Sequence, residues 1–345
     1  MAHKDLRSFL AAIEPSGDLL KIDDQVDWDQ ELSGIGRLSC ERNGPAFQFN
    51  NIKDYAGWRI VANPVATWRR YAVALGLPAD TSVRRLYEIY AEREQQSIAP
   101  LMVKSGACKD VIIPGDKIDL FDLPVPVFSI MDGGPMITGG VVIAEDPEFG
   151  INAGIYRLML KERNITGIDI VTPNNMRKFA ERALARKKPL PISISIGTHP
   201  YELVASTFKA NLGVNELTFA GGLRNEPLRL ADGETVPVPC IADAEIVLEG
   251  EILPEGWVHT EGPFSEFNRL MGGMHMNPRV RIKSIMHRKD AIYYALQMPW
   301  ENIWMSAPIY EAAARRVLFE AGVQTCAINV TPGGCCHWHI VASIK

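Results

Sequence analysis

Segment 259–269, HTEGPFSEFNR, holds two glutamates, Glu261 and Glu266, on either side of a Gly-Pro pair. Pro263 lacks a backbone N–H and disfavours helix at Gly262, so the segment is predicted to be a turn or loop. A turn can bring both carboxylates to one pocket, where burial raises the pKa of a carboxyl group and a nearby cation lowers it. Two glutamates in unlike surroundings could then serve as acid and base. On spacing alone, an exposed acidic loop is the more common explanation.

An amide and a guanidinium that could act with these glutamates occur in GINAGIYR, which is predicted to be a strand. Asn152 and Arg157 would point to opposite faces of a regular strand, so both can face one site only if the chain bends or bulges at Gly154. A guanidinium there could bind a substrate carboxylate through two hydrogen bonds. The alternative is a surface arginine on a strand.

Oxygen ligands for a hard cation occur in two further segments. VTPNNMR places Asn174 and Asn175 at a predicted helix start, where one of them is explained as an N-cap. LADGETVPVP places Glu234 between a glycine and a strand, where a lone glutamate is usually exposed. Together with Asn152, these amides and the carboxylate would suit Mg²⁺ or Mn²⁺ rather than zinc.

The six cysteines are scattered and predict no disulfide framework. The segment CCHWH, residues 335–339, resembles a metal site superficially. However, Cys335 and Cys336 would face opposite sides of the predicted strand, and no second ligand pair has zinc-finger spacing. The segment is therefore predicted to hold buried thiols and histidines, and a zinc hydrolase is the least favoured function.

Composition places the chain among ordinary globular proteins, because its 345 residues are 47% hydrophobic and 22% charged. This length allows two or three domains. A net charge of −5 argues against nucleic-acid binding. No apolar run approaches the ~20 residues needed to span a bilayer, and the N-terminus lacks the apolar core of a signal peptide. We expect a cytoplasmic protein with no nucleic-acid or membrane partner.

Apolar periodicity and turn residues predict the elements that must position these groups. The middle of the chain is rich in strands, and alternation of strand and helix resumes near the end. Residues 101–138 are predicted to be extended chain and loops. Helices are expected at 5–14, 67–77, 81–94, 174–187, 201–208, 216–227 and 308–322, and strands at 58–64, 138–147, 151–160, 165–171, 191–198, 244–253, 279–288, 290–299, 324–331 and 336–344.

The common nucleotide and hydrolase motifs are missing from the sequence: it has no GxGxxG after a strand, no Walker A, no GxSxG and no HExxH. Instead, the order and spacing of several blocks resemble the UbiD family of decarboxylases, which use prenylated FMN. The resemblance runs through most of the chain and is strongest in GINAGIYR, TPNNMR, VASTF, LRNEPLRLADGETVPVPCIADAEIVLEGEI and EGPFSE.

The resemblance implies roles for individual residues. Arg157, Glu261 and Glu266 match the family's catalytic Arg-Glu-Glu network. Asn152 and Glu234 match ligands of a divalent metal that bridges the cofactor phosphate, and Asn175 stands at a ligand position that is often histidine. The cofactor-binding residues implied are Asn152, Ile155, Tyr156, Arg157, Asn174, Ser206, Thr207, Phe208 and Glu234.

The resemblance also implies an α+β fold. Residues 1–108 would form an N-terminal α/β region, residues 109–305 a flavin-reductase-like split β-barrel that binds prenylated FMN, and residues 306–345 the start of a C-terminal α/β oligomerisation domain. Family chains run past this length, and the sequence stops in a strand-like run, so we expect that further residues complete the last domain. A homo-oligomer, dimer or hexamer, is expected.

The function implied is reversible, non-oxidative decarboxylation of an aromatic, heteroaromatic or α,β-unsaturated carboxylic acid. It would proceed through a covalent substrate–cofactor adduct, with Glu266 as proton donor. The implied cofactors are prenylated FMN, Mn²⁺ or Mg²⁺, and optionally K⁺, and a flavin prenyltransferase would supply the flavin. Two alternatives stay open: an oxidoreductase that uses unmodified FMN, and a non-catalytic flavin-binding subunit of a carboxylase complex.

Overall fold

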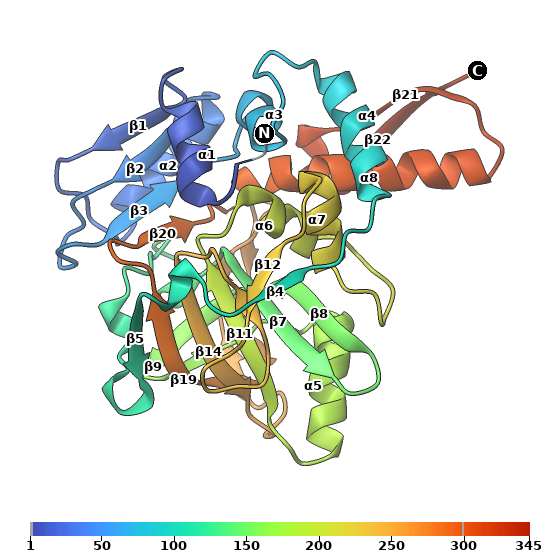
Figure 1. Cartoon of the computed structure of the whole chain (residues 1–345). Coiled ribbons are helices and arrows are strands. Elements are labelled where there is room, and N and C mark those ends of the chain that lie inside the picture. The colour runs from blue at the N-terminus through green and yellow to red at the C-terminus, as the bar shows by residue number, and fades with distance from the viewer. Residues whose placement is uncertain (1–2, 299) are drawn as a thin grey trace.

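The computed structural model describes residues 3–298 and 300–345, and residue 299, the last of a predicted strand, lies outside them with residues 1–2. The α+β class is confirmed, because a large strand-rich part is covered by most of the helices at its upper end and by one more along its lower right side (Figure 1). Within the described ranges, no helix combines the length and the apolar character needed to cross a membrane.

The large central sheet has nine strands in the order β6-β9-β10-β19-β14-β11-β7-β8, with β5 paired to β19. All of its pairs are antiparallel. Its strands are β5 (Val111–Pro114), β6 (Met136–Ile137), β7 (Gly140–Asp146), β8 (Gly150–Ile155), β9 (Leu158–Glu162), β10 (Ile165–Gly167), β11 (Leu190–Ile196), β14 (Ile246–Ile252) and β19 (Arg279–His287).

Chain connectivity forces this sheet to curl. β8 is the last strand of the order and β9 is the second, yet Tyr156 and Arg157 alone connect them. The two ends of the sheet must therefore lie within a few ångströms of each other, because each extended residue spans at most about 3.6 Å. The result is a nearly closed barrel with a split, as the resemblance implied. Arg157 lies at that split.

The N-terminal sheet has the order β1-β2-β3-β20 and is built from β1 (Leu19–Ile22), β2 (Ala46–Phe49), β3 (Arg59–Ala62) and β20 (Ile292–Ala295). β20 pairs in parallel with β3, so a strand from far along the chain completes this sheet. The turn at Lys289-Asp290 thus follows the barrel strand β19 and leads the chain into another sheet. The helices of the same N-terminal part of the chain are α1 (Leu6–Ile13), α2 (Glu31–Glu41), α3 (Trp68–Ala74) and α4 (Val83–Glu94).

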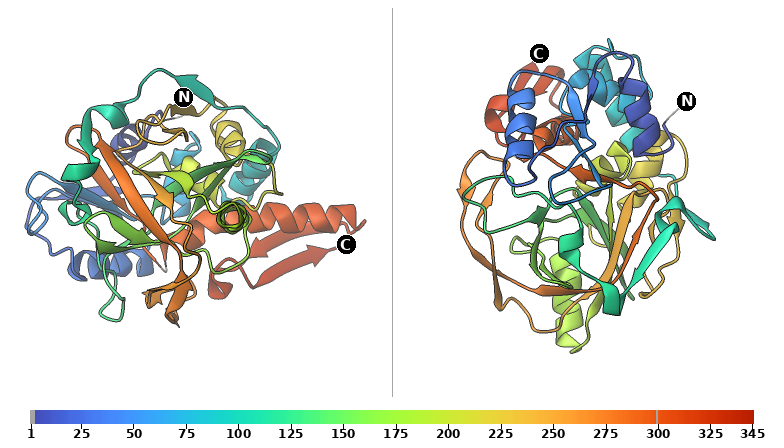
Figure 2. Two further views of the ribbon diagram at one scale, coloured as in Figure 1. Left: turned by 90° about the horizontal axis from the view of Figure 1, so that it is seen from below. Right: turned by 90° about the vertical axis from the view of Figure 1, so that its left-hand side faces the viewer.

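Smaller elements surround the barrel. The helices are α5 (Asn175–Ala185), α6 (Pro200–Ser206), α7 (Leu217–Arg224) and α8 (Glu301–Glu320). A three-stranded sheet joins β13 (Cys240–Ile241), β12 (Arg229–Ala231) and β4 (Leu101–Val103). Three strand pairs are β15 (His259–Glu261) with β18 (His275–Asn277), β16 (Phe264–Ser265) with β17 (Met271–Gly272), and β21 (Thr325–Val330) with β22 (Ile340–Ile344). Figure 2 shows α8 and the β21–β22 pair extending to one side of the molecule.

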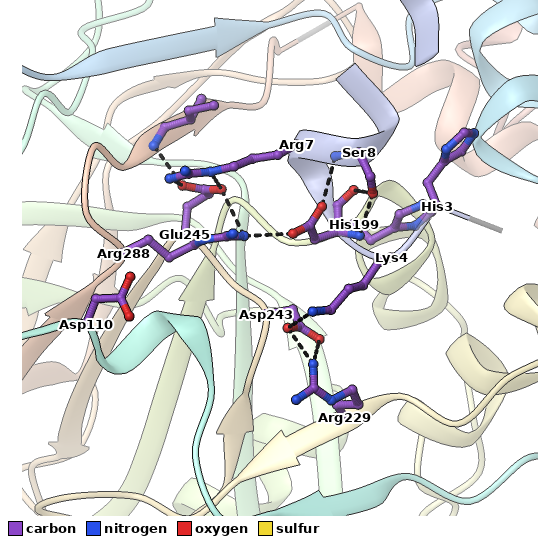
Figure 3. A network of polar contacts seen from close by, with 12 residues as sticks. His3, Lys4, Arg7, Ser8, Asp110, His199, Arg229, Asp243, Glu245 and Arg288 are labelled. Carbon is purple, nitrogen blue, oxygen red and sulfur yellow. Dashed lines mark hydrogen bonds and ion pairs between the residues drawn. The ribbon is translucent and has the colours of Figure 1, made fainter. Parts of the chain in front are cut away.

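A buried acidic residue ties the N-terminal helix to the barrel. The fully buried carboxylate of Glu245 accepts two hydrogen bonds of 2.7 Å from Arg7 of α1. Arg288 Nη1 lies 3.4 Å from the same carboxylate, and the backbone N–H of Ile292 donates to it at 3.0 Å. Figure 3 shows Arg7 and Arg288 converging on Glu245 from different elements. This network fixes α1 and the start of β20 to the end of the barrel.

Two predicted elements near the C-terminus were wrong. α8 begins at Glu301 rather than at Pro308, which lies inside the helix although it cannot donate a backbone hydrogen bond. The strand predicted at 336–344 begins only at Ile340. Cys335 and Cys336 lie in a turn, with left-handed φ angles of 54° and 52°, so they do not alternate across a strand.

Candidate active site

Arg157 is the centre of a cluster of three carboxylates at the barrel split. Its side chain is only 8% exposed, so the surface alternative is wrong. Its Nε and Nη2 donate to Glu261 at 3.2 and 3.3 Å, and Nη2 also lies 2.9 Å from Asp169 Oδ2. Its Nη1 donates to Glu266. Burial disfavours the charge of Arg157, but the three carboxylates outweigh it and raise its pKa.

The bend that aims Arg157 differs from the one expected. β8 stays regular through Gly154 and ends at Ile155, and Arg157 leaves the strand in the link to β9. The ring of Tyr156 packs over Gly154, where an added Cβ would lie 2.6 Å from the ring. The absence of a side chain at Gly154 therefore makes room for Tyr156.

The two glutamates lie in unlike surroundings, as a turn would allow. Glu261 ends β15 and is fully buried, and burial raises its pKa although Arg157 opposes the shift. Glu266 lies beyond the Gly262-Pro263 turn, its side chain is 25% exposed, and it lines a cavity that Glu261 does not reach. Glu266 can therefore exchange a proton with a bound molecule, whereas Glu261 binds Arg157 from outside the cavity.

Asp132 anchors the loop that carries Glu266. One of its oxygens accepts hydrogen bonds from Ser265 N–H and Ser265 Oγ at 2.8 and 3.0 Å. The other accepts from Ser129 N–H at 2.9 Å. Burial raises the pKa of Asp132 despite these donors. This residue was not singled out from the sequence, where an aspartate in SIMDGGP is indistinguishable from an ordinary turn residue.

Asn152 and Asn175 come together, but with Glu216 rather than Glu234. Asn152 Nδ2 donates to Glu216 Oε1 at 2.8 Å, and Ala153 N–H donates to Glu216 Oε2 at 2.9 Å. Burial raises the pKa of Glu216 to about 6, opposed by these donors and by the amide of Asn175. The oxygen Oδ1 of Asn152 is buried and has no hydrogen-bond partner in the described structure. A carboxylate, an unpartnered amide oxygen and a second amide fit a hard divalent cation.

The prediction for Glu234 was wrong. Its side chain is 39% exposed and forms an ion pair of 2.7 Å with Lys109. It does not line the cavity that Asn152 and Asn175 share. The sequence signal for Glu216 was weak, because a glutamate directly before the apolar helix α7 reads as an ordinary helix start.

One cavity of about 670 Å³ connects the two groups of residues. The amides and Glu216 lie at one part of its wall and Arg157 with Glu266 at another. Phe264, Phe267 and Met298 contribute apolar surface. Apart from Glu234, every residue predicted to bind the cofactor lines this cavity: Asn152, Ile155, Tyr156, Arg157, Asn174, Ser206, Thr207 and Phe208.

His337 of the CCHWH segment also lines the cavity. Its ring packs between Phe267 and Tyr310, with ring centroids 4.6 and 4.5 Å away. Burial lowers the pKa of His337, so the neutral imidazole is favoured. Within the described residues, no group of three or more His, Cys, Asp or Glu side chains is placed to hold a metal ion.

Comparison with protein families identifies this architecture. The model of the 3-octaprenyl-4-hydroxybenzoate carboxy-lyase Rift-related domain matches residues 101–299, and the model of the corresponding N-terminal domain matches residues 10–90. The chain belongs to the UbiD family. The family resemblance drawn from the sequence is thereby confirmed.

Individual UbiD-family relatives resemble the chain over most of its length. A phenolic acid decarboxylase of Sedimentibacter hydroxybenzoicus is 33% identical over 320 residues, which cover 87% of this chain and 65% of that protein. HmfF from Pelotomaculum thermopropionicum, a UbiD-class enzyme solved in complex with prFMN, superimposes with a TM-score of 0.92 at 32% identity. That match covers 99% of this chain and 79% of HmfF. The chain thus spans about two thirds of the length of the phenolic acid decarboxylase.

Proposed function

We propose that this chain forms the catalytic part of a reversible, non-oxidative decarboxylase that uses prenylated FMN. The substrate would be an aromatic, heteroaromatic or α,β-unsaturated carboxylic acid. The observation that carries the proposal is the division of roles at the barrel split. Arg157 is held from beneath by buried Glu261 and presents Nη1 beside Glu266 at the cavity wall. The UbiD-class neighbour with bound prFMN supports the flavin.

The residues present fit the implied cofactor and metal. Asn152, Asn175 and Glu216 would hold the divalent cation, and the unpartnered Asn152 Oδ1 is the oxygen that such an ion would satisfy. Tyr156, Ser206 and Thr207 would border the flavin. When bound, prenylated FMN supplies the electron acceptor that decarboxylation requires.

The chain's own residues would bind the acid and move one proton. Arg157 has two hydrogens on Nη1, and Glu266 is the sole acceptor for them among the described residues, so one hydrogen can bind a substrate carboxylate. Glu266 would deliver a proton to the carbon that CO₂ leaves. Glu261 would keep Arg157 in place and balance its charge. The apolar side chains Phe264, Phe267 and Met298 would exclude water and favour a flat, unsaturated substrate.

Self-association belongs to the same proposal. Large exposed apolar side chains gather on the end of α8 and on the hairpin that follows it, including Val317, Phe319, Trp338, Val341 and Ile344. Such a surface supports contact with a second copy. Sedimentation velocity of the purified chain would test self-association. A dimer or larger oligomer is the expected result, and a monomer would contradict it.

The identity of the bound flavin tests the cofactor. The chain would be co-expressed with a flavin prenyltransferase, denatured, and its released small molecules identified by mass spectrometry. Release of prenylated FMN, followed by CO₂ formation from a panel of the three acid classes, is the expected result. Unmodified FMN with reduction by a nicotinamide cofactor would instead establish the oxidoreductase alternative. Prenylated FMN without turnover of any acid would favour the non-catalytic subunit.

Glu266→Gln tests the proton donor. The amide keeps the size of the side chain but cannot deliver the proton, so we expect CO₂ release to fall by at least about 10²-fold. Flavin retention, measured by the same mass spectrometry, should match that of the wild type. Glu181→Gln, which alters an exposed glutamate of α5, is the matched control and should keep full activity. Normal turnover by Glu266→Gln would refute the assignment.

A further inference from the structure

A second buried amide lies beside the Arg157 cluster, outside the cavity wall. Asn277 is the last residue of β18 and is fully buried. Its Nδ2 donates to Glu261 Oε2 at 3.1 Å and to Asp169 Oδ1 at 3.3 Å. Its Oδ1 accepts a hydrogen bond from the backbone N–H of Ile170 at 3.1 Å. All three polar positions of the side-chain amide are therefore used.

These contacts fix the orientation of the amide. A flipped Asn277 would place its oxygen against the carboxylates of Glu261 and Asp169, and its NH₂ group against the N–H of Ile170. Every contact would then place an acceptor against an acceptor or a donor against a donor. A single amide thus donates one hydrogen to each of two carboxylates, and those two carboxylates are the ones that hold the Nε and Nη2 edge of Arg157.

The environment of Glu261 depends on few charged groups. Arg157 and Lys161 are the cations beside it, and Lys161 Nζ also donates to Thr260 O. Asp169 is the anion that acts on Glu261, and Glu266 meets the opposite edge of Arg157. His275 stands opposite Glu261 in the β15–β18 register and is exposed. Asn277 is the neutral group that bridges the two anions, and without it they would face each other across Arg157 alone.

We propose that Asn277 is a positioning residue that holds Glu261 and Asp169 together on one edge of Arg157, so that the other edge of the guanidinium stays aimed at Glu266 and the cavity. The catalytic consequence rests on the proposed function. The positioning contact does not rest on the proposed function, because it concerns only how the side chains of Asn277, Glu261 and Asp169 are arranged in this structure. The role requires a neutral side chain with two donor hydrogens, and aspartate at position 277 would remove them.

Titration of Glu261 in Asn277→Asp tests the proposal. Aspartate has nearly the same shape and keeps the acceptor for Ile170 N–H, but it replaces the donor with a negative oxygen. The chain would be labelled with [5-¹³C]glutamate, and the Glu261 resonance assigned by its loss in Glu261→Gln. We expect the titration midpoint of Glu261 to move to higher pH by about one pH unit or more. In an active preparation, the acidic limb of kcat/KM against pH should move in the same direction.

Two further variants complete the test. Asn63→Asp makes the same change at another fully buried asparagine, after β3, whose Nδ2 donates to Gly36 O. It should lower stability without moving the Glu261 titration or the pH profile. Asn277→Ser introduces no charge, and its single hydroxyl proton cannot serve both carboxylates, so it should move the midpoint in the same direction by less. It replaces Asn277→Asp if that variant does not fold.

The outcomes separate this inference from the proposed function. A Glu261 midpoint unchanged in the position-277 variants would overturn the positioning role, whether or not the enzyme is active. A wild-type chain that holds prenylated FMN and decarboxylates no acid would overturn the proposed function, while the Glu261 titration would still decide the role of Asn277.

Discussion

The position of Glu266 depends on a residue with no side chain. A Cβ built on Gly272 would lie 2.8 Å from Glu266 Oε1 and 2.9 Å from its Cγ. β17, which contains Gly272, pairs with β16 directly before Glu266, so the two residues are brought together by the hairpin. The carboxylate can reach Arg157 because nothing occupies that volume. The position of Glu266, the proposed acid, thus depends on the space left by Gly272 as well as on its ion pair with Arg157.

Gly272→Ala is expected to displace the Glu266 carboxylate and to lower kcat by about 10-fold or more, as a misplaced general acid would. The two closest atoms belong to the flexible side chain of Glu266, and the backbone oxygen of Phe264, at 3.2 Å, has to shift by only a few tenths of an ångström, so the free energy of unfolding should change little. The measurement is CO₂ release at saturating acid, with urea denaturation alongside. Gly273→Ala is the control, because a Cβ on the next residue meets no atom within 4 Å. Equal kcat values for the two variants would contradict the argument.

The sequence predicted most residues of this site, and the failures have a physical cause. Arg157, Glu261 and Glu266 were named from local segments and a family pattern, and they meet in the structure. Glu234 and Glu216 are both glutamates beside a regular element, so local spacing could not choose between them. The tertiary structure decides between them, because it places Glu216, directly before α7, within hydrogen-bonding distance of Asn152. Asn277 was missed because a single asparagine in a short strand carries no local signal.

At the scale of elements, the loop before Glu266 is held in place because its backbone donates a hydrogen bond to the carboxylate of Asp132. The carboxylate binds Ser265 and Ser129 in different segments and so fastens residues 129–134 to β16. Gly133 lies against this loop so closely that an added Cβ would be 2.3 Å from Gly262 O. The turn that separates the two glutamates therefore has a fixed conformation set by tertiary contacts.

Asp132→Ala should release this loop. The amide of Ser265 loses its acceptor, so its hydrogen exchange should accelerate, and the free energy of unfolding should fall by about 2 kcal/mol. Hydrogen–deuterium exchange with mass spectrometry of peptides that contain residues 262–270 would detect the change. Asp119→Ala is the control, because the Asp119 side chain makes a similar local contact, to Phe121 N–H and the exposed Arg163, and among the described residues it makes no hydrogen bond to the loop. Unaltered exchange at 262–270 in Asp132→Ala would refute the anchoring role.

Element boundaries were predictable where amphipathic periodicity is strong and unpredictable where packing overrides it. α5 and β11 agree with their predicted ranges to within a few residues. α8 begins seven residues early because Ile303, Met305 and Ala307 are buried, and their packing offsets the missing donor of Pro308. The pattern of CHWHIVASI suggested a strand from residue 336, whereas the structure places residues 336–339 before β22 and His337 at the cavity.

For the whole molecule, the sequence alone indicated strand content but not strand order. The curl of the barrel follows from β8 and β9 being adjacent in the chain and at opposite ends of the sheet, which periodicity cannot reveal. The departure of β20 to the N-terminal sheet is of the same kind, because the partner β3 is more than 200 residues away. The family resemblance supplied the split barrel but not the departure of β20, and the domain boundaries drawn from it remain predictions that β20 crosses.

Glu301 lies where these parts of the molecule meet, and it makes stability depend on pH. Its fully buried carboxylate accepts hydrogen bonds from Val65 N–H, Tyr294 Oη–H and Gln297 N–H at 3.0, 2.9 and 3.2 Å. It thus joins the segment after β3, the strand β20 and the start of α8. Burial raises the pKa of Glu301 to about 7, although these donors oppose the shift. The folded chain therefore holds this proton at pH values where the unfolded chain has lost it.

The stabilisation contributed by buried acids with raised pKa values, Glu301 among them, should fall as pH rises between about 4.5 and 7, because the unfolded chain binds fewer protons at these groups. Glu301 alone accounts for up to about 3 kcal/mol of this fall at about 1.4 kcal/mol per pH unit. Glu301→Gln cannot titrate, so its urea-derived stability should vary less steeply with pH. The slope should weaken rather than vanish, because burial also raises the pKa of Glu202 to about 7. If Glu301→Gln kept the wild-type slope, as the exposed control Glu181→Gln should, Glu301 would not be a buried acid that makes stability depend on pH.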